Sequence, residues 1–528
     1  PLRPDGEGTN ADGREGQPVI QTPPRSEQDR DDAWVRLPRI LPVSSYLWDH
    51  HFMGKTIFPA VEILQGLAAT VLAHRPEARV TGMRNVSFDR FLEIAENDRE
   101  RIVFHDLKAD GKGLVSARLV TVSPSGKAGI RREKIHAMVD FTAPEWTGTA
   151  FPMDLAAALE GMVYRLPAEQ LYRKLIPFGP AYRNLQGEVL LTENGGVAQV
   201  RAAEYPAPAA PLGSTFPFDG IMHIACAWSQ RFHGIVAFPV GFGERAVPIP
   251  TVPGETYFCR VLPVSAMKEE LIFDMAIYDP EGRVREFIGG MKMRDVSGGR
   301  VRPPGWVRFD GTDPLATIRK HCEALCVIEE AAVAGFAADA LTAGERTRFD
   351  RMGIRRKKNY LMGRLALKIL ARKLAGQDRK FPASAIHTMM EDGVRPFCPD
   401  LAGRGSVFCS LSHDRRFAVA VGGGEPMGID VEFLSGRVLR ARHLYMGETE
   451  STLADRSPLG VPAAALRVWS IKEGVTKALD MPIGEAWQRV RVRNIGEHES
   501  RLTVDGEHFA AFHDTVDDHV FTLVKRES

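Results

Sequence analysis

Two long apolar segments with helical periodicity limit most strongly what this chain can fold into. The first runs from Pro59, a proline at the first helical position, to about His74, and its apolar side chains recur at helical intervals: Ile63, Leu64, Leu67, Val71 and Leu72. The second begins near Asp219 and repeats the pattern. A helix that is apolar nearly all round has to be buried. We therefore expect each helix to be wrapped by other elements.

The segments around the two helices are typical of β-strands. Runs rich in β-branched residues occur at Arg101–His105, Gly113–Val122 and Ile135–Phe141. The pattern of strands around one apolar helix occurs twice between residues 34 and 296. The sequence thus predicts an α+β repeat, about 34–150 and 160–296, joined near Ala143–Leu166.

Length and composition limit the remaining possibilities. A chain of 528 residues exceeds the usual size of one domain, so more than one hydrophobic core is expected. The 68 basic and 67 acidic side chains nearly cancel, which argues against nucleic acid or an anionic membrane as a partner. Because no stretch of 18 apolar residues occurs and no leader is recognisable at the start, we expect a soluble, cytoplasmic protein.

Two segments are typical of linkers. Residues 1–33 are dominated by Gly, Pro and charged residues, a composition that cannot form a core, and a start at Pro1 suggests a piece of a longer polypeptide. Residues 297–314 are rich in turn-forming residues and predict a linker between separate cores. Residues 315–528 then form a second α+β region. We expect helices at 315–337, 354–375 and 467–480, and a strand pair within 406–432.

Four short motifs follow one another in this second region. They are Gly393-Val394-Arg395-Pro396-Phe397, Phe408-Cys409-Ser410-Leu411-Ser412-His413, Gly428-Ile429-Asp430-Val431-Glu432, and Trp469-Ser470-Ile471-Lys472-Glu473-Gly474-Val475-Thr476-Lys477.

The spacing within the last two motifs brings charged side chains together. Asp430 and Glu432 leave the same face of a strand, and Glu473 and Lys477 share a helix face. Converging carboxylates with a cation beside them suit a Mg²⁺ ion that clamps a pyrophosphate. Taken alone, each pair is better explained as a solvated strand edge or as a surface ion pair. The four motifs in this order favour the metal site.

Together these motifs resemble the two-lobed, surfactin-synthetase type of 4′-phosphopantetheinyl transferase, over about 200 residues. The resemblance implies a pseudo-dimeric α+β fold that transfers phosphopantetheine from coenzyme A to an acyl carrier protein. It implies roles for the following residues: Asp430, Glu432 and Glu473 as Mg²⁺ ligands, Glu473 also as base, Lys477 beside the leaving phosphate, and Arg395, Ser412, His413 and Lys472 as coenzyme A contacts. A further acid would be Glu448 or Glu450, and the basic run Arg351–Lys358 would contact coenzyme A or carrier, or form a solvated face.

The first region contains two smaller groups of polar residues, each at the start of an apolar helix. His50 is followed by Gly54 and Pro59, where a glycine allows close backbone approach and amides near a helix start favour a developing oxyanion. Asp219 and His223, at i and i+4, could hydrogen-bond each other, although Asp219 could instead simply cap its helix.

These groups, with Phe178-Gly179-Pro180-Ala181-Tyr182 between them, resemble the double-hotdog dehydratase of polyketide and polyunsaturated-fatty-acid synthases. Ala60 and Pro177 depart from the family pattern and place the shape of the substrate channel in doubt. The resemblance implies that His50 removes an α-proton from a β-hydroxyacyl thioester. Asp219 would protonate the leaving hydroxyl with His223 beside it, and an amide near Gly54 would stabilise the oxyanion.

The order of the two regions is similar to the C-terminus of iterative bacterial polyketide synthases of the enediyne type. That resemblance implies an acyl carrier protein of the same megasynthase and coenzyme A as partners, and leaves a homodimer open. Two alternatives remain for the first region. It could be a silent docking or template module, or a hotdog thioesterase or isomerase.

Overall fold

The computed structural model describes residues 33–110, 113–124, 131–143, 158–205, 210–267, 270–330, 340–376, 383–390, 396–398 and 407–527. The predicted linker at 1–33 lies outside these ranges except for its last residue. Most of the predicted joint between the two repeats, residues 144–157, and the motif residue Arg395 lie outside them as well.

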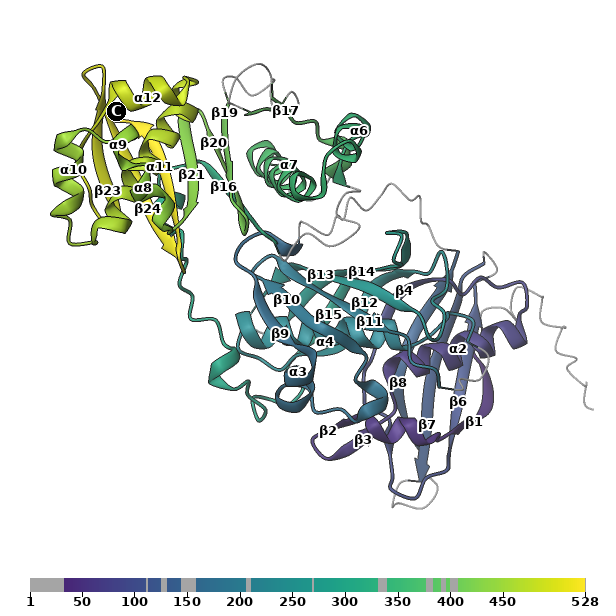
Figure 1. The fold of residues 1–528 in the computed structure, drawn as a ribbon. Coiled ribbons are helices and arrows are strands. Elements are labelled where there is room, and N and C mark those ends of the chain that lie inside the picture. The colour runs from purple at the N-terminus through teal and green to yellow at the C-terminus, as the bar shows by residue number, and fades with distance from the viewer. Residues whose placement is uncertain are drawn as a thin grey trace, which may run out of the picture.

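The first region forms one antiparallel sheet of twelve strands (Figure 1). One half contains, in spatial order, β1 (Val35–Pro42), β6 (Glu100–Ala109), β7 (Val115–Pro124), β8 (Arg131–Thr142) and β4 (Gly82–Ser87). The other half contains β12 (Phe238–Ala246), β15 (Val284–Arg294), β14 (Leu271–Tyr278), β13 (Thr256–Ala266), β11 (Gly195–Arg201), β10 (Leu185–Thr192) and β9 (Tyr164–Pro167). Pairing of β4 with β12 joins the two halves edge to edge.

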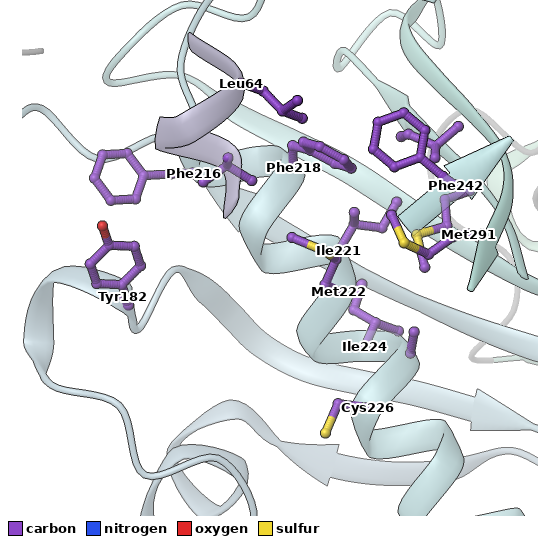
Figure 2. Packing of buried hydrophobic residues seen from close by; sticks show 14 of the residues in the cluster. Leu64, Tyr182, Phe216, Phe218, Ile221, Met222, Ile224, Cys226, Phe242 and Met291 are labelled. Carbon is purple, nitrogen blue, oxygen red and sulfur yellow. The ribbon is translucent and has the colours of Figure 1, made fainter. Parts of the chain in front are cut away.

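Each half of this sheet packs against one long helix, as the sequence predicts. Helix α2 (Ala60–His74) contacts β6, β7 and β8, and α4 (Phe216–Phe232) contacts strands β10 to β14. Their apolar side chains meet in a common core, in which Leu64 of α2, Phe218 of α4 and Phe242 of β12 lie close together (Figure 2). The two helix-bearing halves of the sheet form the arrangement expected of a double hotdog.

The helix starts differ slightly from the predictions. Pro59 is the N-cap of α2 and not its first helical residue. Helix α4 begins at Phe216 with Thr215 at the N-cap. Asp219 therefore lies in the first turn and does not cap the helix, which leaves its carboxyl group available for other contacts.

The second region has two α+β lobes (Figure 1). The first lobe contains β16 (Ala324–Glu329), β20 (Phe417–Gly423) and β19 (Phe408–His413) with helix α7 (Ile354–Ala375) against them. The second contains β21 (Met427–Phe433), β25 (His519–Arg526), β24 (Glu507–Val516), β23 (Glu499–Val504) and β22 (Val490–Asn494) with α11 (Val461–Leu479). Shorter helices of this region include α5 (Ala316–Arg319), α6 (Ala343–Asp350), α8 (Gly436–Arg440), α9 (Arg442–Tyr445), α10 (Glu448–Asp455) and α12 (Ile483–Arg489), whereas the short helix α3 (Ala168–Lys174) belongs to the first region.

The predicted helix at 315–337 is wrong over much of its length. In the described part of this range, residues 315–330, the α-helix covers only Ala316–Arg319, and Ala324–Glu329 forms β16, antiparallel to β20. A short apolar run does not distinguish a buried helix from a buried strand by periodicity. The predicted strand pair within 406–432 is a set of three strands, β19, β20 and β21.

The connection at 297–314 is packed along part of its length against the end of α4. Val307 is fully buried, and its carbonyl accepts a hydrogen bond of 3.1 Å from Nη1 of Arg231. The amide of Phe309 donates to the carbonyl of Arg231 at 2.8 Å. The connection is thus fastened to the first region.

A second contact joins the two regions directly. The amide of Gly161 donates to the carbonyl of Val327 in β16 at 2.9 Å, and the amide of Val163 donates to Oε2 of Glu329 at 3.1 Å. Glu160 forms an ion pair with Lys373 of α7. Buried side chains of both regions also share one hydrophobic cluster. The two regions therefore do not have the fully separate cores that the sequence predicts.

One further expectation concerns the membrane. Within the described residues, we find no helix with the length and hydrophobicity needed to cross a bilayer.

Candidate functional site

A cavity of about 520 Å³ lies in the first region and collects its predicted site residues. His50 follows a short 3₁₀ turn (Ser45–Asp49) in the first repeat, and Asp219 and His223 lie on α4 in the second. All three line the cavity, and most of the remaining lining is apolar, including Phe58, Phe178, Met222, Val236, Phe238, Met293 and Val301. The cavity therefore brings titratable groups from both repeats together in an apolar setting.

His50 is held so that one ring nitrogen faces Asp219. Its Nδ1 lies 2.9 Å from the carbonyl oxygen of Ile57, which fixes Nδ1 as the donor of a neutral ring. Nε2 then carries a lone pair and lies 3.9 Å from Oδ1 of Asp219. Burial lowers the pKa of His50, and the Asp219 carboxyl opposes this only in part. His50 is thus prepared to act as a neutral base.

Asp219 has His223 on its other side. Nε2 of His223 lies 3.1 Å from Oδ2 of Asp219, one helical turn away, and both side chains are buried. Nδ1 of His223 lies 3.1 Å from the hydroxyl of Tyr172. Asp219 and His223 are therefore close, as predicted, but Nε2 of His223 and Oδ2 of Asp219 form no hydrogen bond with each other. Tyr172 is a neighbour that sequence reasoning missed, because an isolated tyrosine in a short amphipathic helix gives no signal.

Gly54 lies in a turn that borders the cavity. It is exposed, and with Met53 it forms the two-residue turn between β2 (His51–Phe52) and β3 (Lys55–Ile57), with φ of 77° and 50° respectively. No atom lies within 4 Å of the position that a Cβ at Gly54 would take, so close approach does not require this glycine. The predicted oxyanion contact near it stays a prediction.

The Gly-Pro segment matters through a contact that the sequence did not reveal. A Cβ on Gly179 would lie 2.1 Å from Oδ1 of Asp49, the residue before His50. The amide of Gly179 donates to the carbonyl of Asp49, and the amide of Ala181 donates to its Oδ2, each at 2.8 Å. The segment thereby holds the second repeat against the chain that carries His50, whose ring lies 4.6 Å from that of Phe178.

The second region brings together several residues of its predicted metal site. Asp430 on β21 is buried, and its Oδ1 accepts hydrogen bonds from Oγ of Ser412 and from Nζ of Lys477, each at 2.9 Å. Its Oδ2 is buried and has no hydrogen-bond partner in the described part of the chain. An unsatisfied buried carboxylate oxygen is costly unless a further group binds it.

Neighbouring carboxyl groups around Asp430 repel one another, as the pKa values of Glu432 and Glu473 indicate. Burial, Asp430 and Glu473 raise the pKa of Glu432 to about 7, although Nε1 of Trp469 donates to Glu432 at 3.1 Å. Burial and Asp430 also raise the pKa of Glu473, against the influence of Lys477. A divalent cation would relieve this repulsion.

The fit to a metal ion is nevertheless incomplete. Among the residues that the structure describes, no three His, Cys, Asp or Glu side chains are already placed to hold one ion. The unsatisfied Oδ2 of Asp430 and the raised carboxyl pKa values fit a cation. The ligands would still have to converge on it, because Lys477 now occupies Oδ1 of Asp430.

Lys472 does not reach this site, which corrects its prediction as a coenzyme A contact. Its Nζ is buried, forms an ion pair of 2.8 Å with Oε2 of Glu450 and donates to the carbonyl of Tyr445. Glu450 is fully engaged in the core as well, since it also accepts from the amides of Gly447 and Val492. Adjacent residues on a helix are about 100° apart, so Lys472 and Glu473 point in different directions.

The other predicted coenzyme A contacts differ in position. His413 is exposed at the end of β19, whereas Ser412 is buried against Asp430. Arg395 lies outside the described residues. The coenzyme A roles of these residues stay predictions, as does the further acid, for which the alternative to the buried Glu450 is the exposed Glu448.

Comparison with known proteins gives similarity at the level of structure only. No protein-family model and no curated protein matches the sequence. Solved dehydratase structures are similar to about half of this chain. They include an N-terminal dehydratase of the difficidin assembly line (11% identity, TM-score 0.39, 50% of this chain and 94% of that one) and a dehydratase domain of a trans-AT polyketide synthase from Brevibacillus brevis (12%, 0.39, 50% and 94%). A third is the dehydratase domain of the CurF module of the curacin polyketide synthase (16%, 0.40, 49% and 93%).

Proposed function

We propose that the first region eliminates water from a β-hydroxyacyl thioester carried by an acyl carrier protein. The observation that carries this proposal is the pair formed by His50 Nε2 and Asp219 Oδ1, 3.9 Å apart in an apolar cavity. A base and an acid at this separation can act on neighbouring carbons of one substrate.

The chemistry needs a neutral His50, which burial favours, and an Asp219 that carries a proton. Nε2 of the neutral His50 ring takes the proton from the α-carbon, and the C–H electrons form the new double bond. The C–O bond at the β-carbon breaks, and Asp219, in its protonated form, gives its proton to the departing hydroxyl. One water leaves, and a proton has moved from substrate to His50 and from Asp219 to water. Proton exchange with solvent then restores both groups.

The test uses the whole chain and a carrier protein loaded with a β-hydroxyacyl group. Intact-mass measurement should show loss of one water from the loaded carrier. Release of the free acid would instead indicate a thioesterase, and a shifted double bond in an enoyl substrate an isomerase. A substrate of unchanged mass with every chain length tried would leave the docking or template alternative.

We further propose that the second region transfers 4′-phosphopantetheine from coenzyme A to a carrier serine. The supporting observation is the carboxyl group of Asp430, with one oxygen held by Ser412 and Lys477 and the other buried and unsatisfied. Asp430, Glu432 and Glu473 would hold Mg²⁺, which when bound would neutralise the charge of the pyrophosphate.

The chain's own residues would then handle the protons. Glu473, whose pKa is raised, accepts the proton of the carrier serine, and Lys477 balances the charge of the departing phosphate. The test is the mass of an apo carrier protein incubated with the chain, coenzyme A and Mg²⁺. We expect a gain of one phosphopantetheine, absent after chelation of the metal and in Asp430→Ala. Transfer at the parent rate by Asp430→Ala would refute this assignment.

With both activities, the chain would load a carrier and act on the acyl group that the loaded carrier bears. This combination supports the hypothesis that it belongs to an iterative bacterial polyketide synthase of the enediyne type. The carrier protein would be the shared partner of the two regions.

A further inference from the structure

Tyr172 lies behind the proposed acid of the first region without lining the cavity. It is on helix α3, is buried, and its ring meets that of His223 edge-on at 5.7 Å between centroids. Its hydroxyl oxygen accepts a hydrogen bond of 3.0 Å from the amide of Leu185. The same hydroxyl lies 3.1 Å from Nδ1 of His223. Tyr172 thus connects a fixed backbone amide to the histidine beside Asp219.

The direction of the hydrogen bond between Tyr172 and His223 follows from counting donors. The hydroxyl accepts from Leu185, so its own hydrogen needs an acceptor, and Nδ1 of His223 is the acceptor that the described residues offer. The reverse direction would leave a buried O–H without a partner, which is unfavourable. Nδ1 of His223 is therefore the acceptor, and the proton of the neutral ring resides on Nε2.

This tautomer decides how Asp219 carries its own proton. Nε2 of His223 lies 3.1 Å from Oδ2 of Asp219, a close contact whose alignment falls short of a hydrogen bond, and neither atom has a hydrogen-bond partner in the described residues. A proton on Nε2 of His223 would lie beside Oδ2 and favour that oxygen as the unprotonated one. The proton of the carboxylic acid then sits on Oδ1, the oxygen that faces His50 and the cavity.

We propose that Tyr172 is a positioning residue, which fixes the tautomer of His223 and thereby directs the acidic proton of Asp219 toward the substrate. The proposal rests on the proposed role of Asp219 as the acid. It extends that role by assigning the orientation of the acid to a chain of contacts from Leu185 through Tyr172 and His223.

The decisive measurement is the tautomer of His223, read from its ¹⁵N resonances in chain labelled at histidine, with His223→Gln used for assignment. The parent chain should show the Nε2–H form. Tyr172→Phe should shift the population toward the Nδ1–H form, because the donor to Nδ1 is gone while the ring remains. This readout does not require catalysis, so it remains valid if the chain proves not to be a dehydratase.

A kinetic experiment compares Tyr172→Phe with a control substitution at another buried tyrosine. Tyr257 is also buried, and its hydroxyl also accepts from a backbone amide, that of Val252, at 2.7 Å, but it lies outside the cavity lining. Tyr172→Phe should lower kcat for dehydration about tenfold with KM changed less than about twofold. Tyr257→Phe should leave both constants near those of the parent.

A double variant separates positioning from general loss of packing. The amide of Gln at position 223 can donate to Asp219 without any tautomer to set, so in His223→Gln the further change Tyr172→Phe should have little added effect. A merely structural tyrosine would give additive losses. An Nδ1–H form in the parent chain, or a tautomer and a kcat that Tyr172→Phe leaves unchanged, would overturn the proposal.

Discussion

Nε2 of His50 lies 3.9 Å from Oδ1 of Asp219, although the two residues belong to different repeats of the sheet. His50 is placed by the bond from its Nδ1 to the carbonyl of Ile57, and Asp219 by the first turn of α4. The Gly179–Asp49 contact holds the second repeat against the chain that carries His50. The proposed acid and base thus meet only when both repeats are folded against each other.

We expect His50→Ala and Asp219→Asn each to lower dehydration by ~10²-fold or more, because each removes one proton-transfer group. Asn is nearly isosteric with Asp, so the fold should persist, which thermal melting checks. Continued formation of the enoyl product by Asp219→Asn would place the acid elsewhere, and His223 would be the next residue to change.

The pH dependence of the same reaction follows from the environment of His50. Because burial lowers its pKa below the ordinary value of 6.5, the base stays neutral below that pH and protonates only when the pH falls further. The acidic limb of kcat/KM should therefore lie below pH 6.5. A limb at or above 6.5 would contradict the assignment of His50 as a buried base.

A third prediction concerns the part of the cavity wall that Val301 forms. Val301 belongs to the connection between the regions and lines the cavity. The amide of Val301 donates to Oγ of Ser297, which itself donates to Asp295, so this part of the wall is held in place. Val301→Phe should shorten the longest acyl chain that is dehydrated and Val301→Ala should lengthen it, measured as kcat/KM over a series of chain lengths. Identical series for both variants would exclude contact of the acyl chain with Val301.

The sequence predicted the first region well because its signals were local and repeated. Two apolar helices among β-branched runs define the double sheet, and the predicted residues His50, Asp219 and His223 line one cavity. It could not reveal Tyr172 or Asp49, because their partners are distant in sequence and each residue alone is ordinary. Lys472 shows the opposite difficulty. Its place in the fourth motif predicted a contact with coenzyme A. Its side chain instead points into the core, where it pairs with Glu450, and such packing cannot be predicted from the motif.

A fourth prediction tests the cluster of carboxyl groups in the second region. Glu432 has a folded-state pKa of about 7, above the unfolded value of 4.5, so its contribution to stability is present below 4.5 and is lost as pH rises through 7. Glu432→Gln should reduce the decline of the melting temperature between about pH 5 and about pH 8. Mg²⁺ should raise the melting temperature of the parent more than that of Glu432→Gln. Equal responses to Mg²⁺ in the two proteins would remove Glu432 from the ligand set.

The fifth prediction concerns the contact between the two regions. After proteolysis of an inserted cleavage site at Gly305, we expect the two pieces to elute together, because the contacts of Gly161 and Val163 with β16 remain. Lys373→Ala, which removes the ion pair with Glu160, should weaken this association, whereas Lys357→Ala on the same helix should not. Within the intact chain, Lys477→Ala should still leave dehydration of a pre-loaded carrier within about twofold of the parent, since the two sites share no element with two alternative states. Pieces that elute separately after cleavage would show that the contact seen here is too weak to hold the regions together. A large loss of dehydration in Lys477→Ala would instead show that the interface transmits changes from one site to the other.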